Sequence, residues 1–168
     1  MSKVLISSIF IVLISFEGRA QIFTKPNENL LFSFKTERGK LLELAIDSSG
    51  QYLAYRYGTE DNIELQFPNE LNIESWNRFY FSWYTRGGGI MNSAMDINHL
   101  YFTINNYTYT VYSEYYAEEG EQFSYGIRVK DNKTNKSIAH IQALPESIIG
   151  SLFPLRENTK IIEGDEIF

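Results

Sequence analysis

Residues 100–111 read LYFTINNYTYTV, in which two asparagines, Asn105 and Asn106, interrupt a run of aromatic and β-branched residues. Asparagine tolerates the left-handed backbone of a tight hairpin turn, so these two residues predict a chain reversal. Side chains alternate along a strand, and a two-residue turn here gives one wholly apolar or aromatic face. A slip of one residue destroys that face, which specifies the register. The expected pairs are Leu100 with Val111, Phe102 with Tyr109, and Ile104 with Tyr107.

The same test predicts three further hairpins. Turns are expected at residues 37–39 and 49–50, where Gly39 and Gly50 supply left-handed backbone, and at residues 59–61. The expected pairs are Phe34–Leu42 and Phe32–Leu44 around the first turn, Ile46–Leu53 and Leu44–Tyr55 around the second, and Tyr57–Ile63, Tyr55–Leu65, Leu53–Phe67 and Arg56–Glu64 around the third.

Short alternating segments joined by turns continue along the chain, at residues 78–85, 123–130 and 136–142. They predict an all-β fold, an antiparallel up-and-down β-barrel or sandwich of about eight strands with little helix. Short helical turns are expected only in residues 69–76 and 145–152. The acidic tail, residues 157–168, is expected to be loosely held or to add an edge strand.

The first twenty residues have the three-part order of a secretory signal peptide: Lys3, an apolar run, and small residues before a cut at Gln21. The apolar run is shorter than the 20 or so residues that span a bilayer, although an uncleaved anchor is the alternative. We therefore expect residues 1–20 to be removed. Residues 21–168 then form a single exported β domain, periplasmic or secreted, with no integral membrane span.

Charge narrows the choice of partner. The full chain carries a net charge of −6, and loss of Lys3, Arg19 and Glu17 with the leader makes it −7. An acidic domain repels phosphate backbones, so nucleic acid is not expected as a partner. A basic protein is favoured, because opposite charges accelerate encounter. There is no cysteine, so stability must come from the core rather than from disulfides.

The most distinctive loop contains Tyr84, Arg86 and the three glycines Gly87, Gly88 and Gly89. Glycines leave backbone N–H groups open to close approach, and arginine binds carboxylates with two parallel hydrogen bonds. No Lys-Ser/Thr follows and no helix begins here, so this is not a phosphate loop. We expect these five residues to contact a partner; a flexible hairpin connection is the alternative.

Ser93, Asp96 and His99 lie close in the sequence and suggest a hydrolase as an alternative function. Nearness in sequence does not make a catalytic triad, and no nucleophile elbow surrounds the serine. The chain has only two histidines, His99 and His140, and no cysteine, so neither a metal site nor a cofactor is expected. No residue is therefore assigned a catalytic role.

Aromatic residues are abundant, with 12 Phe, 12 Tyr and 2 Trp. Exposed tyrosines suit contact surfaces, because they bury a large area and keep a polar tip; a covering layer over them is the alternative. The tyrosines expected on outward faces are Tyr52, Tyr80, Tyr84, Tyr101, Tyr112 and Tyr116.

The stretches YLAYRYGTEDNIELQFP, RGGG and LYFTINNYTYTVYSEYY, within residues 51–130, resemble a group of small exported bacterial proteins. That resemblance implies export and a β-rich fold. Ser49, Gly50 and Tyr52 are also similar to the Ser-Gly-x-x-Tyr signature of periplasmic inhibitors of c-type lysozymes, with the tyrosine one residue earlier. Those inhibitors are small β-barrels that insert a loop into the lysozyme cleft, so the resemblance implies that these three residues contact a partner.

Together these features predict a non-catalytic exported binding protein. Its expected partner is a protein, an inhibited or neutralised cell-wall hydrolase of the lysozyme type. A carbohydrate- or lipid-binding β-barrel is the first alternative, and a hydrolase is the second.

Overall fold

The structure is a computed structural model that describes residues 22–117 and 122–165. It confirms the all-β fold and shows two sheets with little helix. The expected signal peptide lies outside the described residues, as do the last three residues of the acidic tail. Within the part of the chain that the structure describes, no helix has the length and apolar character needed to cross a membrane.

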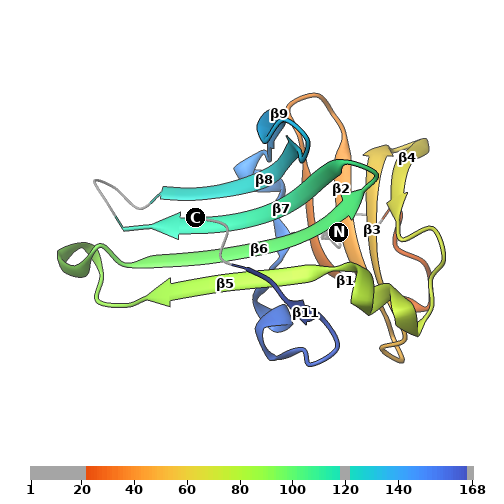
Figure 1. The fold of residues 1–168 in the computed structure, drawn as a ribbon, viewed down its shortest axis with the longest axis horizontal. Coiled ribbons are helices and arrows are strands. Elements are labelled where there is room, and N and C mark those ends of the chain that lie inside the picture. The colour runs from red at the N-terminus through yellow and green to blue at the C-terminus, as the bar shows by residue number, and fades with distance from the viewer. Residues whose placement is uncertain (1–21, 118–121, 166–168) are drawn as a thin grey trace, which may run out of the picture.

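The first sheet has five strands in the order β10-β1-β2-β3-β4, all antiparallel (Figure 1). β4 forms one edge of this sheet, and the two-residue strand β10 forms the other. The strands are β1 (Glu28–Lys35), β2 (Leu41–Asp47), β3 (Leu53–Thr59), β4 (Asn62–Phe67) and β10 (Ile149–Gly150).

The second sheet has six strands in the order β11-β5-β6-β7-β8-β9. Only the β11–β5 pair is parallel, and it adds part of the acidic tail to the sheet as an edge strand. The strands are β5 (Tyr80–Arg86), β6 (Met95–Ile104), β7 (Tyr107–Tyr116), β8 (Gln122–Asp131), β9 (Lys136–Gln142) and β11 (Ile162–Glu163).

The helical segments are short 3₁₀ turns between strands. The first is held by a capping box, in which Asn72 and Ser75 exchange side-chain-to-backbone hydrogen bonds. The helical turns expected in residues 69–76 and 145–152 overlap with η1 and η3, but residues 149–150 of the second stretch form the strand β10. The four segments are η1 (Ile73–Arg78), η2 (Ile90–Asn92), η3 (Pro145–Ser147) and η4 (Phe153–Glu157).

The hairpin of residues 100–111 has the predicted register. Asn105 adopts positive φ, 53°, and Leu100 faces Val111 as expected. The pairings predicted around residues 37–39 and 49–50 are also confirmed. Local turn chemistry together with one apolar face was sufficient to specify these three pairings.

The predicted pairing of β3 with β4 is wrong by two residues along most of its length. Thr59 faces Asn62, and a bulge at Gly58 then sets Tyr57 opposite Leu65 and Arg56 opposite Gln66 instead of Glu64. A Cβ on Gly58 would lie 2.1 Å from the Asn62 carbonyl oxygen, so only glycine allows this close approach. In consequence Glu64 pairs with Lys40.

The core lies between the inner faces of the two sheets. Phe102 of β6 stacks on Phe67 of β4 at 4.2 Å between ring centroids, and also contacts Tyr55 of β3 and Phe79. Side chains from both sheets fill this space in one continuous cluster, as expected for a sandwich. A filled interior counts against a central ligand cavity.

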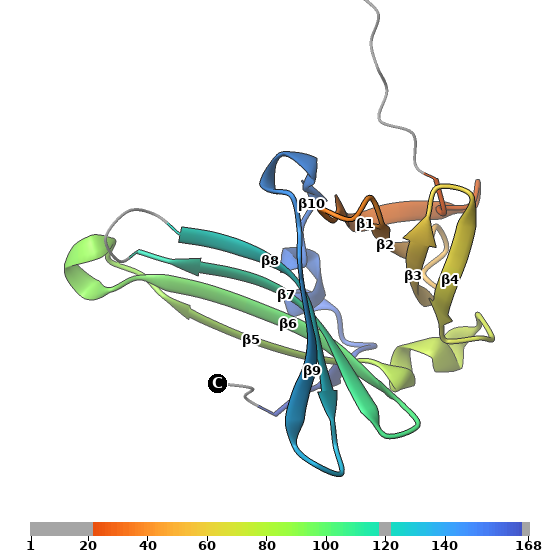
Figure 2. The ribbon, with the colours of Figure 1, turned by 90° about the horizontal axis from the view of Figure 1, so that it is seen from above.

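Half of the second sheet projects beyond the first sheet (Figure 2). We call this part the arm: residues 82–98, 113–117 and 122–125. The core-side face of its strands continues past the point where the first sheet ends. The arm is therefore covered by a sheet on neither face, and the connection between β5 and β6 lies at the far end of the molecule.

Candidate functional site

The two predicted contact loops lie at opposite ends of the molecule (Figure 1). The turn of Ser49 and Gly50 joins β2 to β3 and is tied to the body. The Gly50 carbonyl accepts hydrogen bonds from Trp76 Nε1 (3.2 Å) and Lys160 Nζ (2.7 Å), and Ser49 Oγ donates to Asp47. Residues 84–89 begin within β5 and continue into the connection at the end of the arm. The loops therefore do not form one surface.

Tyr52, expected at a contact surface, is buried in the body. Its hydroxyl donates to Glu28 Oε1 (2.9 Å) and accepts from Asn27 Nδ2 (3.1 Å). The first described residues cover this side of the first sheet. Glu43 holds them there, because its carboxylate accepts hydrogen bonds from the Ile22 and Phe23 amides. The alternative expectation for the outward tyrosines, a covering layer, therefore applies to Tyr52.

The glycine loop at the end of the arm is folded onto itself. Arg86 donates two hydrogen bonds to the Ser93 carbonyl, at 3.0 and 2.6 Å, so its guanidinium is engaged within the loop. Asn92 Nδ2 donates to the Gly87 carbonyl at 2.7 Å, and Gly88 and Gly89 both have positive φ. These bonds present the intervening segment, η2, at the extreme end of the arm.

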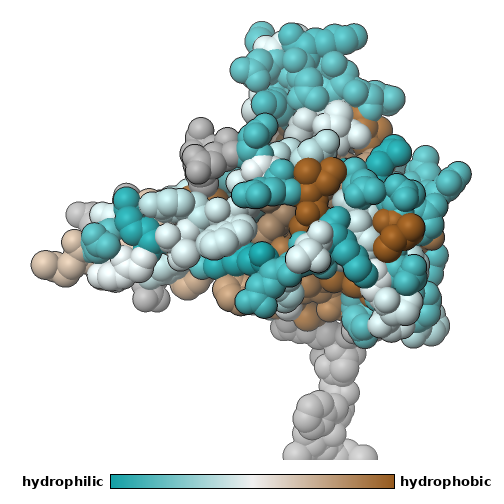
Figure 3. All heavy atoms as spheres, turned by 60° about the horizontal axis from the view of Figure 1, so that its bottom comes forward, coloured by the Kyte–Doolittle hydropathy of each residue, from teal (hydrophilic) through white to brown (hydrophobic). Residues whose placement is uncertain are grey.

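Two apolar side chains of η2 are exposed at that end. Ile90 is 65% exposed and Met91 is 99% exposed. In the space-filling view the arm is a narrow projection with apolar atoms at its end (Figure 3). Sequence reasoning nominated the adjacent glycines and missed these two residues, although an apolar pair directly after three glycines was a visible signal.

The core-side face of the arm exposes further aromatic rings. Trp83 on β5 is 47% exposed and Phe123 on β8 is 56% exposed, and both continue the alternation that buries Phe81 and Ile127. The first sheet does not reach these positions, so the same pattern that makes core residues elsewhere makes surface residues here.

Arg156 of η4 joins the C-terminal segment to the base of the arm. Its guanidinium lies over the Trp83 ring (4.8 Å) and the Phe153 ring (4.7 Å), and it donates hydrogen bonds to Asn98 and Asp96. The Arg156 side chain is largely buried. These contacts hold Trp83 in a fixed orientation.

The residues suggested for a hydrolase are not brought together. Asp96 lies on the core-side face of β6, with Asn98 and Arg156 as partners. His99 points to the other face, where its Nε2 lies 2.6 Å from Glu114 Oε1. Ser93 precedes the strand and accepts the Arg86 hydrogen bonds through its carbonyl. The three side chains share no cleft.

A charged network occupies the outward face of the second sheet. Glu114 accepts hydrogen bonds from His99 and, at 2.6 and 2.8 Å, from Arg128, whose guanidinium lies 3.9 Å from the Tyr112 ring. Burial raises the pKa of Glu114, but hydrogen bonds from His99 and Arg128 and their charges outweigh it and lower the pKa to about 2. The Tyr112 hydroxyl pairs in turn with His140 at 2.7 Å.

This network predicts a loss of stability in acid. A carboxyl whose pKa falls from 4.5 unfolded to about 2 folded stabilises the fold above pH 4.5, and this stabilisation is lost as the pH falls toward 2. The loss is roughly 3 kcal/mol by the size of the shift. Denaturant unfolding of the wild type and Glu114→Gln across this range measures it. Parallel curves for the two proteins would contradict the prediction.

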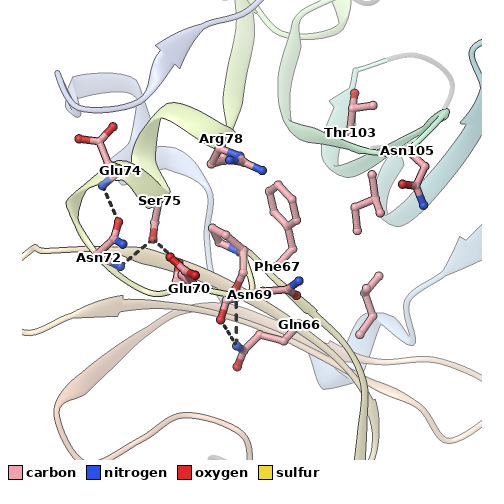
Figure 4. Close-up of a pocket in the computed structure, with 13 residues that line it drawn as sticks. Gln66, Phe67, Asn69, Glu70, Asn72, Glu74, Ser75, Arg78, Thr103 and Asn105 are labelled. Atoms are coloured by element: carbon pink, nitrogen blue, oxygen red, sulfur yellow. Dashed lines mark hydrogen bonds between the residues drawn. The ribbon is translucent and has the colours of Figure 1, made fainter.

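An open cleft lies where the edge of the first sheet meets the second sheet (Figure 4). It has a volume of about 540 Å³ and is bounded by β4, η1 and the turn between β6 and β7. Polar side chains surround a small apolar floor. Its lining includes Leu65, Asn69, Glu70, Glu74, Arg78, Ile104 and Asn105. β4 and η1 are consecutive in the chain, but the β6–β7 turn is remote from them in sequence, so no local motif predicts the cleft.

The described residues contain no group of three or more His, Asp or Glu side chains arranged to hold a metal ion. Two surfaces offer groups for binding: the arm exposes apolar side chains, and the cleft holds polar side chains that have no partner among the described residues. Comparisons of the chain with family models, with curated proteins and with solved structures found no match.

Proposed function

We propose that this chain is a non-catalytic exported binding protein whose arm engages a protein partner. The observation that supports the proposal is the exposure of Ile90 and Met91 at the end of a projecting arm. Apolar side chains cost free energy when they stay in water, so a partner that buries them gains affinity. A narrow projection suits a partner with a cleft.

The sides of the arm supply the residue types that dominate protein interfaces. Trp, Phe and Arg are enriched at the centres of such interfaces. Trp83, Phe153 and Arg156 gather at the base of the arm, and Phe123 lies on the same face of the sheet, nearer its outer end. Because Arg156 already fixes Trp83, binding there loses little side-chain freedom.

The proposed partner is a basic cell-wall hydrolase of the lysozyme type, which the arm would inhibit. A net charge of −6, or −7 without the expected leader, complements a basic enzyme and accelerates encounter. The active site of such a hydrolase is a cleft, which matches the shape of the arm.

The test is an inhibition titration. Residues 21–168 are added to a c-type lysozyme in a cell-wall lysis assay at low and at physiological salt. We expect inhibition that weakens as salt rises, because screening reduces the attraction between opposite charges. Met91→Glu should raise the inhibition constant by roughly tenfold or more, since it buries a carboxylate in an apolar contact.

Ile138→Glu is the matched control, because Ile138 is also an exposed apolar residue (55%) but lies on β9, away from the arm. It should inhibit like the wild type. Equal inhibition by Met91→Glu and the wild type would overturn the role of the arm. Absence of inhibition in a panel of basic and acidic muramidases would overturn the partner class.

A carbohydrate- or lipid-binding protein remains the alternative function. The filled interior argues against a lipid in the centre of the fold, so such a ligand would have to bind an outer surface. The hydrolase alternative lacks a supporting geometry, because Asp96 and His99 point to opposite faces of β6.

A further inference from the structure

We infer that the cleft between β4, η1 and the β6–β7 turn binds a short peptide that carries both a carboxylate and a cationic group. This site is separate from the arm and does not depend on the function proposed for it. Four features of the cleft, each judged among the described residues, carry the inference: an unpaired cation, two carboxylates without a cationic partner, unpaired amides, and an open strand edge.

The cation is Arg78, the last residue of η1. Its side chain is exposed and, among the described residues, makes no hydrogen bond or ion pair. Figure 4 shows it reaching toward the gap that separates η1 from Thr103 and Asn105. A guanidinium presents a planar pair of donors that matches a carboxylate, and such charge-assisted pairs are strong.

Two carboxylates line the same cleft on the η1 side. Glu70 makes no side-chain hydrogen bond to any described residue, and Glu74 accepts only one, from Asn77 Nδ2 at 3.0 Å. Neither lies within ion-pair distance of Arg78 or another described cation. Separated opposite charges that do not pair with each other select a ligand that carries both charges.

The remaining polar groups suit a peptide backbone. The side-chain amides of Asn69 and Asn105 have no partners among the residues described, and each offers one acceptor and two donors, as a peptide group needs. Leu65 and Ile104 are half-buried and give the cleft an apolar floor for one side chain.

The edge of the first sheet adds main-chain hydrogen bonding. β4 has β3 on one side and no strand on the other within the described chain, so alternate residues direct N–H and C=O groups outward. Strand addition to such an edge is a common mode of peptide recognition. The cleft volume of about 540 Å³ lies within the usual range for small-ligand sites and accommodates a few residues.

Other ligands match the cleft less well. A phosphorylated ligand would meet Glu70 and Glu74 beside the single arginine, and like charges repel. A neutral saccharide would leave the Arg78 and Glu70 charges without partners. A dipolar peptide satisfies all of these groups.

The test uses a mixture of random-sequence tetrapeptides without Asp, Glu, His, Lys or Arg, so that the termini carry the only charges. The mixture is made in four forms: both termini free, amidated at the carboxyl end, acetylated at the amino end, and capped at both ends. Equilibrium dialysis against residues 21–168, read by mass spectrometry, measures retention. Retention should be greatest for the free peptides. Each cap should reduce it by roughly tenfold, the effect of losing one charge-assisted hydrogen bond.

Charge variants assign each end of the peptide. In Arg78→Gln, amidation should no longer reduce retention, whereas acetylation still does. In the double variant Glu70→Gln/Glu74→Gln, the reverse should hold. Arg38→Gln, in the exposed β1–β2 turn, makes the same charge change as Arg78→Gln, and Glu37→Gln beside it neutralises one carboxylate; both should leave all four retentions unchanged. The denaturation midpoint of each variant checks that the fold is intact.

Equal retention of all four forms, or no retention of any, would overturn the inference. Retention of maltotetraose in place of the peptides would show a saccharide site and would also overturn it. Met91→Glu in the arm should retain peptides normally, so failure here and failure of the proposed function are distinguishable.

Discussion

Phe102→Ala should lower the free energy of unfolding by about 3–5 kcal/mol, the range for truncating a buried aromatic ring. Phe102 is fully buried and joins the two sheets. Its ring stacks on Phe67 at 4.2 Å and meets Tyr55 and Phe79 edge-on at 4.9 and 5.5 Å. A fourth ring, Tyr109 of β7, stacks on Phe102 at 5.3 Å. Alanine removes these contacts and leaves a cavity that the four surrounding rings cannot readily fill.

Urea unfolding of the purified domain measures the loss, with Phe102→Leu as a milder variant if the alanine protein does not fold. The matched control is Phe123→Ala, which makes the same chemical change on the arm, where the ring is 56% exposed. It should cost less than about 1 kcal/mol. Similar losses for Phe102→Ala and Phe123→Ala would show that the arm is packed against the core rather than projecting.

Arg56→Met should be comparably destabilising, by roughly 3–5 kcal/mol, because it leaves a buried carboxylate without its partner. The side chains of Arg56 and Glu28 are both fully buried. Their two hydrogen bonds, at 2.6 and 2.7 Å, are bidentate, and Arg56 Nη1 also donates to the Phe23 carbonyl at 3.1 Å. Methionine fills much of the volume of the Arg56 side chain but carries no charge to balance the Glu28 carboxylate.

The double variant Glu28→Met/Arg56→Met separates the charge from the packing. Removal of both ions should restore most of the stability lost in the single variant. Lys35→Met provides a surface comparison, since the Lys35–Glu60 pair is about half exposed and should contribute less than about 1 kcal/mol. A double variant as unstable as Arg56→Met alone would show that the hydrogen bonds of Arg56, and not its charge, are what matters.

Much of the fold was predictable because it is encoded locally. The turn at Asn105 and Asn106 and the apolar pairs around it specify a register without reference to the rest of the chain. The same reasoning failed at Gly58, because a bulge is invisible in a pattern of apolar residues: it depends on one close backbone contact. The alternating pattern of β4 fits the predicted and the observed register equally well, because a shift of two residues keeps each side chain on the same face.

The candidate surfaces were harder to predict, because they depend on relative positions of segments. The sequence pointed to the loop of residues 84–89, but it did not show that Trp83 and Phe123 lie beyond the reach of the first sheet. One signal was available: β6, β7 and β8 each have ten residues, whereas β1 to β4 have six to eight. Strands of unequal length in two packed sheets leave part of the longer sheet uncovered.

The continuity of β6, β7 and β8 has a mechanical consequence. Their ladders run without interruption from the central rings to the outermost pairs, Met95 with Tyr116 and Tyr116 with Gln122. The arm is therefore a cantilever with no hinge at its base. A partner that binds the tip therefore contacts a rigid structure, and binding restricts little further motion of the arm. A pull on the tip would be borne by the same ladder that supports the hydrophobic interior.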